Sequence, residues 1–281
     1  MKIIVTGGAG FVGTALCEQL KEKHTVVSLD NYSIGSEENH IPEVSYVRGD
    51  VVEIENILEN DFDLCFHLAA LSRIQPSFQK PINTFKSNTE GVQKVLDWCQ
   101  LNNTKCVYSG SSSKHHNPHI SPYALYKFVG EEICKMYRKV FQLDVEIVRF
   151  YNVYGPGEII DGDWAAVIGL WRRMIRDNEP ITIVGDGNQR RDFTHINDIV
   201  DGLIKIGFTN ETHPDAWELG SGSNYSINEV ADLFESKFNC SRRYIEDQPG
   251  NYRITLREND DSLQRLQWKP KESLKEYILS L

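Results

Sequence analysis

A tyrosine and a lysine at helical spacing are the two side chains whose arrangement most clearly suggests chemistry. Tyr123 and Lys127 are four residues apart at the start of an expected helix, so they share one face. An ammonium group that close is expected to stabilise a phenolate and lower the tyrosine pKa, which suits a general base near neutral pH. Ser111 ends the preceding strand region and could hydrogen-bond a substrate hydroxyl. The same spacing also fits an amphipathic helix with a core tyrosine and a solvated lysine, so the pair needs support from its surroundings.

A glycine-rich segment near the start of the chain provides that support. The first strand-like run leads directly into GGAGFVG at 7–13, where a helix is expected to begin. Gly7 permits a tight turn, Gly10 lets the backbone approach a pyrophosphate, and Gly13 lets helix and strand pack closely. The helix N-terminus adds N–H donors and the positive end of its dipole. The glycine pattern alone could mark a mere turn.

An acidic residue ends the next expected strand. Asp30 follows Gly7 by 23 residues. A carboxylate there accepts hydrogen bonds from both ribose hydroxyls of an adenosine and repels a 2′-phosphate. Because the strand, the glycine loop, the helix and the acidic residue follow one another at the required spacing, the sequence predicts dinucleotide binding, with NAD favoured over NADP.

Short apolar runs alternate with helical patterns over the first 155 residues, which indicates an α/β fold with a parallel sheet covered on both faces. The expected strands are Lys2–Thr6, Thr25–Asp30, Ser45–Arg48, Asp63–Leu68, Lys105–Ser109 and Val145–Phe150. The expected helices are Phe11–Lys23, Asn88–Asn102, Tyr123–Phe141 and Asp198–Phe208. After about Pro156 glycine-rich turns separate shorter elements. We therefore expect a dinucleotide-binding domain over 1–155 and a smaller C-terminal substrate-binding lobe over 156–281, with 190–208 returning to the first domain.

These motifs, taken in order, resemble the extended short-chain dehydrogenase/reductase family, in particular its NAD-dependent nucleotide-sugar epimerases and dehydratases of the UDP-glucose 4-epimerase-like type. The similarity covers nearly the whole chain and implies a Rossmann-type, doubly wound parallel sheet. The matching segments are GGAGFVG (7–13), LDNYSIG (29–35), RGDV (48–51), FHLAA (66–70), QKP (79–81), VYSGSSS (107–113), YALYK (123–127), RFYNVYGPG (149–157), GDGNQRRDFTHINDI (185–199) and LQWKP (266–270).

The resemblance also implies residue roles. Ser111 matches the catalytic Ser/Thr of the family, Tyr123 its base and Lys127 its ribose-binding lysine. The positions that match NAD-binding residues are Gly7, Gly10, Phe11, Val12, Gly13, Asp30, Asn31, Ser33, Gly35, Asp50, Val51, Leu68, Ala69, Ala70, Asn88, Tyr123 and Lys127. The expected substrate-binding residues are Asn152, Val167, Arg191 and Arg253. The Arg191 guanidinium suits a diphosphate because it forks onto phosphate oxygens, although by itself it also fits a solvated surface charge.

The residues after Ser111 bear on the type of reaction. Ser112 and Ser113 stand where the family's dehydratases carry an Asp–Glu pair, its decarboxylases a Glu and its 3,5-epimerising members a Cys. What remains is redox chemistry at one carbon, so the expected reaction is 4-epimerisation of a nucleotide sugar through a transient 4-keto sugar. The alternatives are a nucleotide-sugar 4-reductase, another sugar-modifying enzyme of the same family, or a non-catalytic dinucleotide-binding protein.

Two segments depart from the family pattern. Only 11 residues separate Ser111 from Tyr123, where the family has a longer loop beside the sugar. Gln248 stands where many epimerases have a phosphate-binding arginine, and Arg253 is the candidate substitute.

The composition narrows the choice of partner and compartment. The formal net charge of −10 disfavours nucleic acid as a partner. Six cysteines without close pairing indicate a reducing compartment, and no signal peptide or membrane-spanning run is evident, so we expect a cytoplasmic enzyme. The histidines at 115, 116 and 119 read as a polar loop, and no metal is expected.

Apolar residues around two helices predict a homodimer: Val92, Val95, Leu96, Val129 and Ile133.

Overall fold

The computed structural model describes residues 1–59 and 61–281. The chain forms two compact units. The first unit comprises Met1–Arg149 and Val200–Trp217, and the second comprises Phe150–Ile199 and Glu218–Leu281.

A seven-stranded sheet organises the first unit, in the order β11-β6-β5-β4-β1-β2-β3. Its strands are β1 (Lys2–Thr6), β2 (Thr25–Asp30), β3 (Ser45–Arg48), β4 (Leu64–His67), β5 (Lys105–Ser111), β6 (Val145–Phe150) and β11 (Trp217–Leu219). The pairs β3–β2, β2–β1, β1–β4 and β4–β5 are parallel. β4 is buried along its whole length and β1 beyond its first residue, as expected for strands covered on both faces. The predicted doubly wound α/β fold is confirmed.

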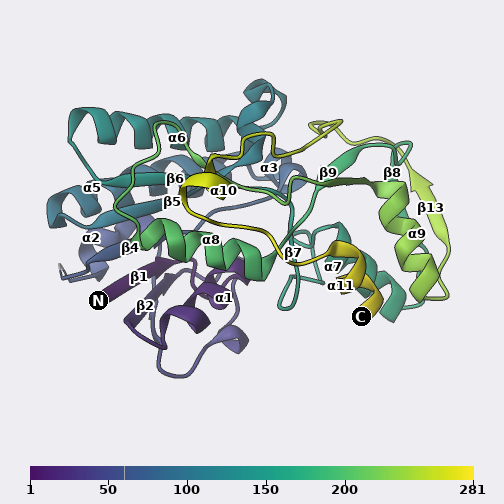
Figure 1. Ribbon diagram of the computed structural model, residues 1–281, viewed down its shortest axis with the longest axis horizontal. Coiled ribbons are helices and arrows are strands. Elements are labelled where there is room, and N and C mark those ends of the chain that lie inside the picture. The colour runs from purple at the N-terminus through teal and green to yellow at the C-terminus, as the bar shows by residue number, and fades with distance from the viewer. Residues whose placement is uncertain (60) are drawn as a thin grey trace. The chain divides into compact units, whose positions relative to one another are not determined.

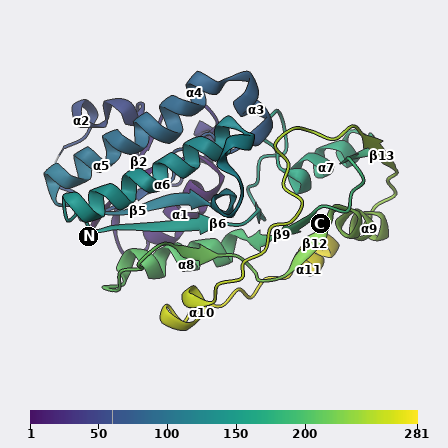
Figure 2. The ribbon, with the colours of Figure 1, turned by 90° about the horizontal axis from the view of Figure 1, so that it is seen from above.

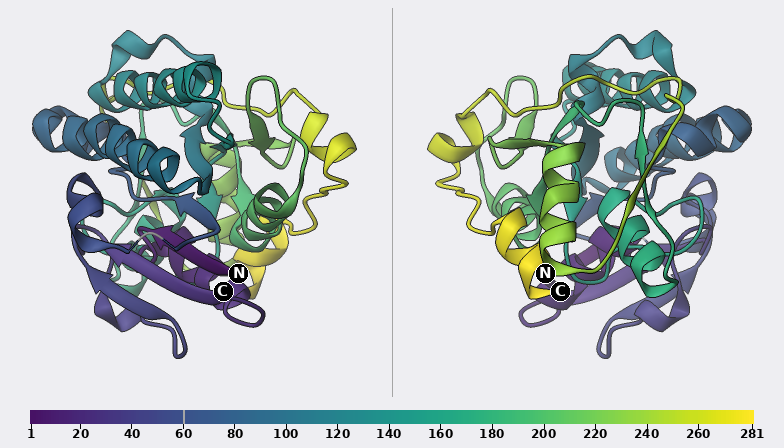
Figure 3. Two further views of the ribbon diagram at one scale, coloured as in Figure 1. Left: turned by 90° about the vertical axis from the view of Figure 1, so that its left-hand side faces the viewer. Right: turned by 90° about the vertical axis from the view of Figure 1, so that its right-hand side faces the viewer.

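Helices cover both faces of this sheet (Figure 1). α5 (Gly91–Asn102) and α6 (Pro122–Val140) pack on one face, and α1 (Phe11–Leu20) and the part of α8 (Ile196–Phe208) that belongs to this unit lie on the other, as the end-on views of Figure 3 also show. The short helices are α2 (Ile54–Ile57), α3 (Ile74–Gln79) and α4 (Pro81–Phe85).

The core beneath α5 and α6 accounts for the apolar residues of these helices. Val92, Val95 and Leu96 are at most 1% exposed and belong to this core. Ile133 is partly buried and packs against it. These four residues therefore pack within one chain and do not themselves form a dimer surface, and the homodimer stays a prediction.

Short strand pairs and helices build the second unit (Figure 2). β7 (Val153–Tyr154) pairs with β10 (Thr194–His195), β9 (Arg190–Asp192) with β12 (Asn224–Ser226), and β8 (Ile181–Val184) with β13 (Arg242–Ile245). The helices are α7 (Val167–Arg176), α9 (Ile227–Lys237), α10 (Asp261–Arg265) and α11 (Leu274–Ser280). Trp171 and Phe234 meet edge-on in its core, with ring centroids 5.4 Å apart.

Candidate active site

The glycine loop between β1 and α1 has no room for a side chain at Gly7 or Gly13. Gly7 has φ +73°, and a Cβ there would lie 2.8 Å from the Ala69 backbone nitrogen. A Cβ on Gly13 would lie 2.0 Å from the Gly7 carbonyl oxygen. Gly10 caps α1 without any side-chain hydrogen bond to the first turn, so that turn presents its N–H groups to a ligand. The loop thus has the shape and the donors that a pyrophosphate requires.

The carboxylate of Asp30 lies beside this loop. It is buried and accepts hydrogen bonds from the backbone N–H groups of Ala9 at 3.0 Å and Tyr32 at 2.8 Å. A carboxylate has about four acceptor positions, so it retains capacity for ribose hydroxyls. Asp50 accepts from the Asn31 amide at 2.9 Å, which joins two segments expected to meet the adenosine. These residues fit an adenine dinucleotide without a 2′-phosphate.

Asn88 has a structural task. Its side chain is fully buried, accepts from the Leu71 N–H at 2.8 Å and donates to the Leu71 carbonyl at 2.9 Å. The Thr6 hydroxyl accepts from the Ala69 N–H at 3.2 Å. These three hydrogen bonds hold the segment after β4, and Gly7 meets that segment at Ala69. Asn88 therefore shapes the candidate cofactor site through the Leu68–Leu71 backbone.

Ser111, Tyr123 and Lys127 come together at the carboxyl end of β5. The Tyr123 hydroxyl donates to Ser111 Oγ at 3.2 Å, and Lys127 Nζ donates to the Ser109 carbonyl at 2.8 Å. Ser121 caps α6 and Pro122 occupies its first turn, so the helix begins one residue before Tyr123. The Tyr123 N–H donates to Ser77 Oγ at 3.1 Å, which ties α3 to the same place.

Burial governs the electrostatics of this group. It raises the pKa of Tyr123, although the Ser111 hydrogen bond and the Arg73 charge act in the opposite direction. The pKa of Lys127 is lowered to about 8, again because burial disfavours its charge, while Glu131 opposes that shift. The expected lowering of the Tyr123 pKa is thus not what the structure shows, because this pKa is raised. Desolvation outweighs the neighbouring charges.

Two expected substrate-binding residues in the second unit have suitable environments. Asn152 donates to the Asp192 carbonyl at 2.8 Å and to Thr255 Oγ1 at 3.1 Å, so its position is fixed. Arg191 donates to the Arg190 carbonyl at 2.9 Å, and burial lowers its pKa to about 10. No carboxylate in residues 1–59 and 61–281 pairs with Arg191, which suits an anionic ligand.

The other two expected substrate residues are less informative. Val167 begins α7 and is partly buried. Arg253 is 64% exposed and forms a two-pronged ion pair with Asp186, with both distances at 2.9 Å. Its guanidinium already has an anionic partner, so it is a weaker phosphate ligand than Arg191.

In the shortened loop, His115 ends the 3₁₀ turn Ser112–His115, His116 follows it, and His119 lies in the 3₁₀ turn Pro118–Ile120. Over the described part of the chain, the three side chains grouped closely enough to hold a metal are Cys65, Cys99 and Cys106. All three are fully buried in the apolar core of the first unit. That environment is typical of inert structural cysteines.

Comparison with known proteins identifies the family. Residues 3–220 match the model of the NAD dependent epimerase/dehydratase family. The chain belongs to this family. It is thus an enzyme of the NAD-dependent nucleotide-sugar epimerase/dehydratase type, and NAD is its cofactor.

Several family members align over nearly the whole chain. A putative UDP-glucose 4-epimerase of Methanocaldococcus jannaschii is 32% identical over 300 residues, which are 98% of this chain and 95% of the relative. UDP-glucuronic acid decarboxylase 3 of Arabidopsis thaliana is 28% identical over 301 residues, with 98% and 86% covered. The crystal structure of UDP-glucuronic acid 4-epimerase from Bacillus cereus with UDP-glucuronic acid and NAD superposes with a TM-score of 0.86 at 26% identity, covering 99% of this chain and 96% of that one. None of the described helices is long and apolar enough to cross a membrane.

Three charged residues of the candidate site were missed by the sequence analysis. Arg73 acts on the Tyr123 hydroxyl through its charge. Glu131 and Arg149 form a buried ion pair behind Ser111. The spacing of Glu131, one further helical step after Tyr123 and Lys127, was the available signal. No sequence pattern pointed to Arg73.

Proposed function

We propose that the protein is an NAD-dependent nucleotide-sugar 4-epimerase. The observation that carries this proposal is the hydrogen bond between the Tyr123 hydroxyl and Ser111 Oγ at 3.2 Å. The two residues after Ser111 in the chain are also serines and not carboxylates. The buried Ser113 hydroxyl has no protein partner among the described residues. Ser112 and Ser113 lack the acid and base that elimination of water or loss of a carboxylate would use.

In this proposal three residues handle the proton of the sugar 4-hydroxyl. Ser111 accepts or donates a hydrogen bond to that hydroxyl and orients it, and Tyr123 removes its proton. Lys127 lies one helical turn away, and its ammonium stabilises the developing phenolate. NAD, when bound, supplies the hydride acceptor and a positive charge. Tyr123 returns the proton after the 4-keto sugar has turned over and been reduced on its other face.

Arg191 and Asn152 are the proposed anchors of the nucleotide diphosphate. Arg191 offers a partly buried guanidinium without a carboxylate partner among the described residues, and Asn152 is held rigidly by two hydrogen bonds. The relatives whose names specify UDP-sugars support a nucleotide-sugar substrate for this chain as well. The proposed setting is a cytoplasmic homodimer.

A panel of UDP-, GDP- and dTDP-sugars, scored by NMR for epimer, keto sugar and carbon dioxide, tests the reaction. We expect the 4-epimer as the product, without added cofactor, because the same NAD is used in both half-reactions. Absorbance of the denatured supernatant measures the NAD that remains bound after purification. A product that has lost carbon dioxide or water, or a strict requirement for added NADH, would replace the epimerase assignment.

A further inference from the structure

A buried carboxylate on the catalytic helix reaches the strand that ends at Ser111. Glu131 lies four residues after Lys127 and eight after Tyr123, so the three side chains follow one face of α6. Glu131 is 1% exposed. Its Oε1 accepts a long hydrogen bond, at 3.4 Å, from the Ser111 backbone N–H.

Strand β5 makes room for this carboxylate at Gly110. A Cβ at that position would lie 2.6 Å from Glu131 Oε1, so any larger residue would push the carboxylate away. Glycine inside a strand weakens it and often marks a close approach. Here the approaching group is the Glu131 carboxylate.

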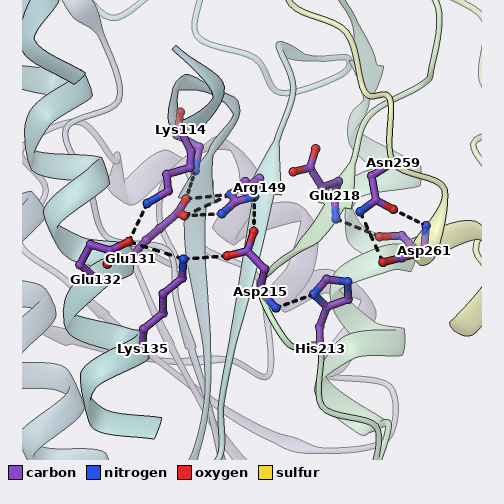
Figure 4. Close-up of polar contacts among 12 residues, drawn as sticks. Lys114, Glu131, Glu132, Lys135, Arg149, His213, Asp215, Glu218, Asn259 and Asp261 are labelled. Atoms are coloured by element: carbon purple, nitrogen blue, oxygen red, sulfur yellow. Dashed lines mark hydrogen bonds and ion pairs between the residues drawn. The ribbon is translucent and has the colours of Figure 1, made fainter. Parts of the chain in front are cut away.

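Arg149, at the end region of β6, holds the other side of the carboxylate. Its Nε lies 3.2 and 3.1 Å from the two Glu131 oxygens, and its Nη2 lies 2.8 Å from Oε2. The same guanidinium contacts Asp215 Oδ2 at 2.9 Å, so it stands between two carboxylates (Figure 4). One buried carboxylate thus joins α6, β5 and β6, with its charge matched by a two-pronged arginine.

We propose that Glu131 is a positioning residue that fixes α6 against the end of β5 and thereby keeps Tyr123 and Lys127 in register with Ser111. The inference rests on the proposed function, in which these three residues carry the chemistry. Glu131 touches neither substrate nor cofactor in this role. It acts through the backbone of Ser111 and through its charge.

The charge of Glu131 also acts on Lys127. The groups facing Lys127 are His67 of β4, Tyr108 of β5, and Glu131 and Cys134 of α6. Burial lowers the pKa of His67 to about 3, so this histidine is neutral at working pH. Glu131 opposes the lowering of the lysine pKa, which stands at about 8. Without Glu131, Lys127 would lose its proton at lower pH, and the ammonium that the phenolate needs would be lost in the neutral range.

The neighbouring residue provides a matched control. Glu132 is exposed and contacts Lys114 at 2.6 Å and Lys135 at 3.5 Å, at the surface of the same charged network (Figure 4). Within residues 1–59 and 61–281, no hydrogen bond or ion pair joins Glu132 to β5 or to Lys127. Glu132→Gln therefore removes the same charge from the same helix and leaves the contacts of Glu131 with β5 and Arg149 in place.

The experiment compares the NAD-loaded parent, Glu131→Gln and Glu132→Gln. The pKa of Lys127 is read from ¹³C NMR titration of its Cε, assigned with Lys127→Met, and turnover is measured against pH. We expect the Lys127 midpoint and the alkaline limb of turnover to move together to lower pH in Glu131→Gln. Turnover at pH 8 should fall about fivefold if the midpoint moves from about 8 to about 7, with a smaller loss at pH 6.5. Glu132→Gln should match the parent in both.

Two further variants protect the test against misfolding, since Glu131→Gln leaves a buried guanidinium with one partner fewer. Glu131→Gln/Arg149→Met removes that charge and should show the same shift. Gly110→Ala keeps every charge but displaces the carboxylate, and should lower turnover. Parent-like midpoints and turnover in any folded Glu131 variant would overturn the inference, as would a loss of turnover with an unchanged pH profile. If the parent epimerises no sugar, the proposed function fails, and the lysine titration still decides the role of Glu131.

Discussion

Tyr123 is the residue on which the proposed chemistry depends most directly. Tyr123→Phe removes the hydroxyl that donates to Ser111 and keeps the ring, so folding and NAD content should persist. Turnover should fall by about 10²–10⁴-fold, the range for loss of a general acid–base group. The measurement is interconversion of an active nucleotide sugar, with NAD content determined on the same samples.

The matched control for this variant is Tyr126→Phe, on the same helix. The Tyr126 ring packs against Phe85, and it has no place in the proposed proton path. Tyr126→Phe should retain parent turnover. If Tyr123→Phe did so as well, Tyr123 would have to be removed from the mechanism.

Asp30 should decide which dinucleotide binds. In the folded protein its carboxylate already accepts two backbone N–H bonds, so Asp30→Ala removes both the ribose acceptor and a support of the glycine loop. NAD affinity should weaken by about ten- to a hundredfold, as for loss of hydrogen bonds to a charged group, and the discrimination against NADP should relax. Titration of both dinucleotides by calorimetry measures this. The control is Asp61→Asn, at an exposed carboxylate that pairs with Lys2. Unchanged NAD affinity in Asp30→Ala would show that the adenosine ribose does not bind at Asp30.

At the scale of elements, the contact between β1 and α1 depends on the absence of a side chain at Gly13. In Gly13→Ala the new Cβ would overlap the Gly7 carbonyl oxygen at 2.0 Å, so the helix must move away from the strand. Overpacking of this kind costs about 1–3 kcal/mol. Urea unfolding should show that loss together with reduced NAD content. Gln19→Ala, at an exposed position of α1, should change neither the free energy of unfolding nor the NAD content. Full NAD retention in Gly13→Ala would contradict the requirement for close packing at this glycine.

The elements that sequence patterns predicted well are those whose signal is local. The apolar runs of β1 and β2 gave the observed bounds because strands covered on both faces are continuously apolar. The bounds of β3 were also predicted, although this edge strand has no buried residue. β5 continues two residues past its predicted end, because Gly110 and Ser111 are poor strand formers that tertiary contacts hold in place. The residues before α5 form a π-helical turn at Lys86–Glu90, which helical periodicity does not reveal.

The same distinction applies to the site. The glycine loop and the Tyr123–Lys127 pair were visible because their partners are neighbours in sequence. The ion pair of Glu131 with Arg149 joins residues 18 positions apart on a helix and a strand, and only the fold brings them together. The raised pKa of Tyr123 likewise comes from burial, which spacing alone does not show.

At the scale of the whole molecule, the proposed homodimer needs exposed apolar side chains, because Val92, Val95 and Leu96 are buried in the core of one chain. The large apolar side chains that remain exposed on α4 and α6 include Ile82 at 70%, Phe85 at 43% and Val140 at 60%. Sedimentation equilibrium should give twice the chain mass of 32.2 kDa at tens of micromolar. Val140→Glu and Ile82→Glu should each shift the mass toward the single chain. A 32.2 kDa species for the parent protein would rule the dimer out.

The placement of the cysteines gives the first unit its own reporter of opening. Cys17, Cys65, Cys99, Cys106 and Cys134 are buried in the first unit, and Cys240 is partly exposed in the second. A thiol reagent therefore modifies Cys240 in the native protein, whereas the other five react only after their unit opens. A ligand that binds the folded state slows such opening. Mass spectrometry can follow the labelling of those five thiols with and without added dinucleotide. The labelling rate then measures how fast the first unit opens in the unmodified chain.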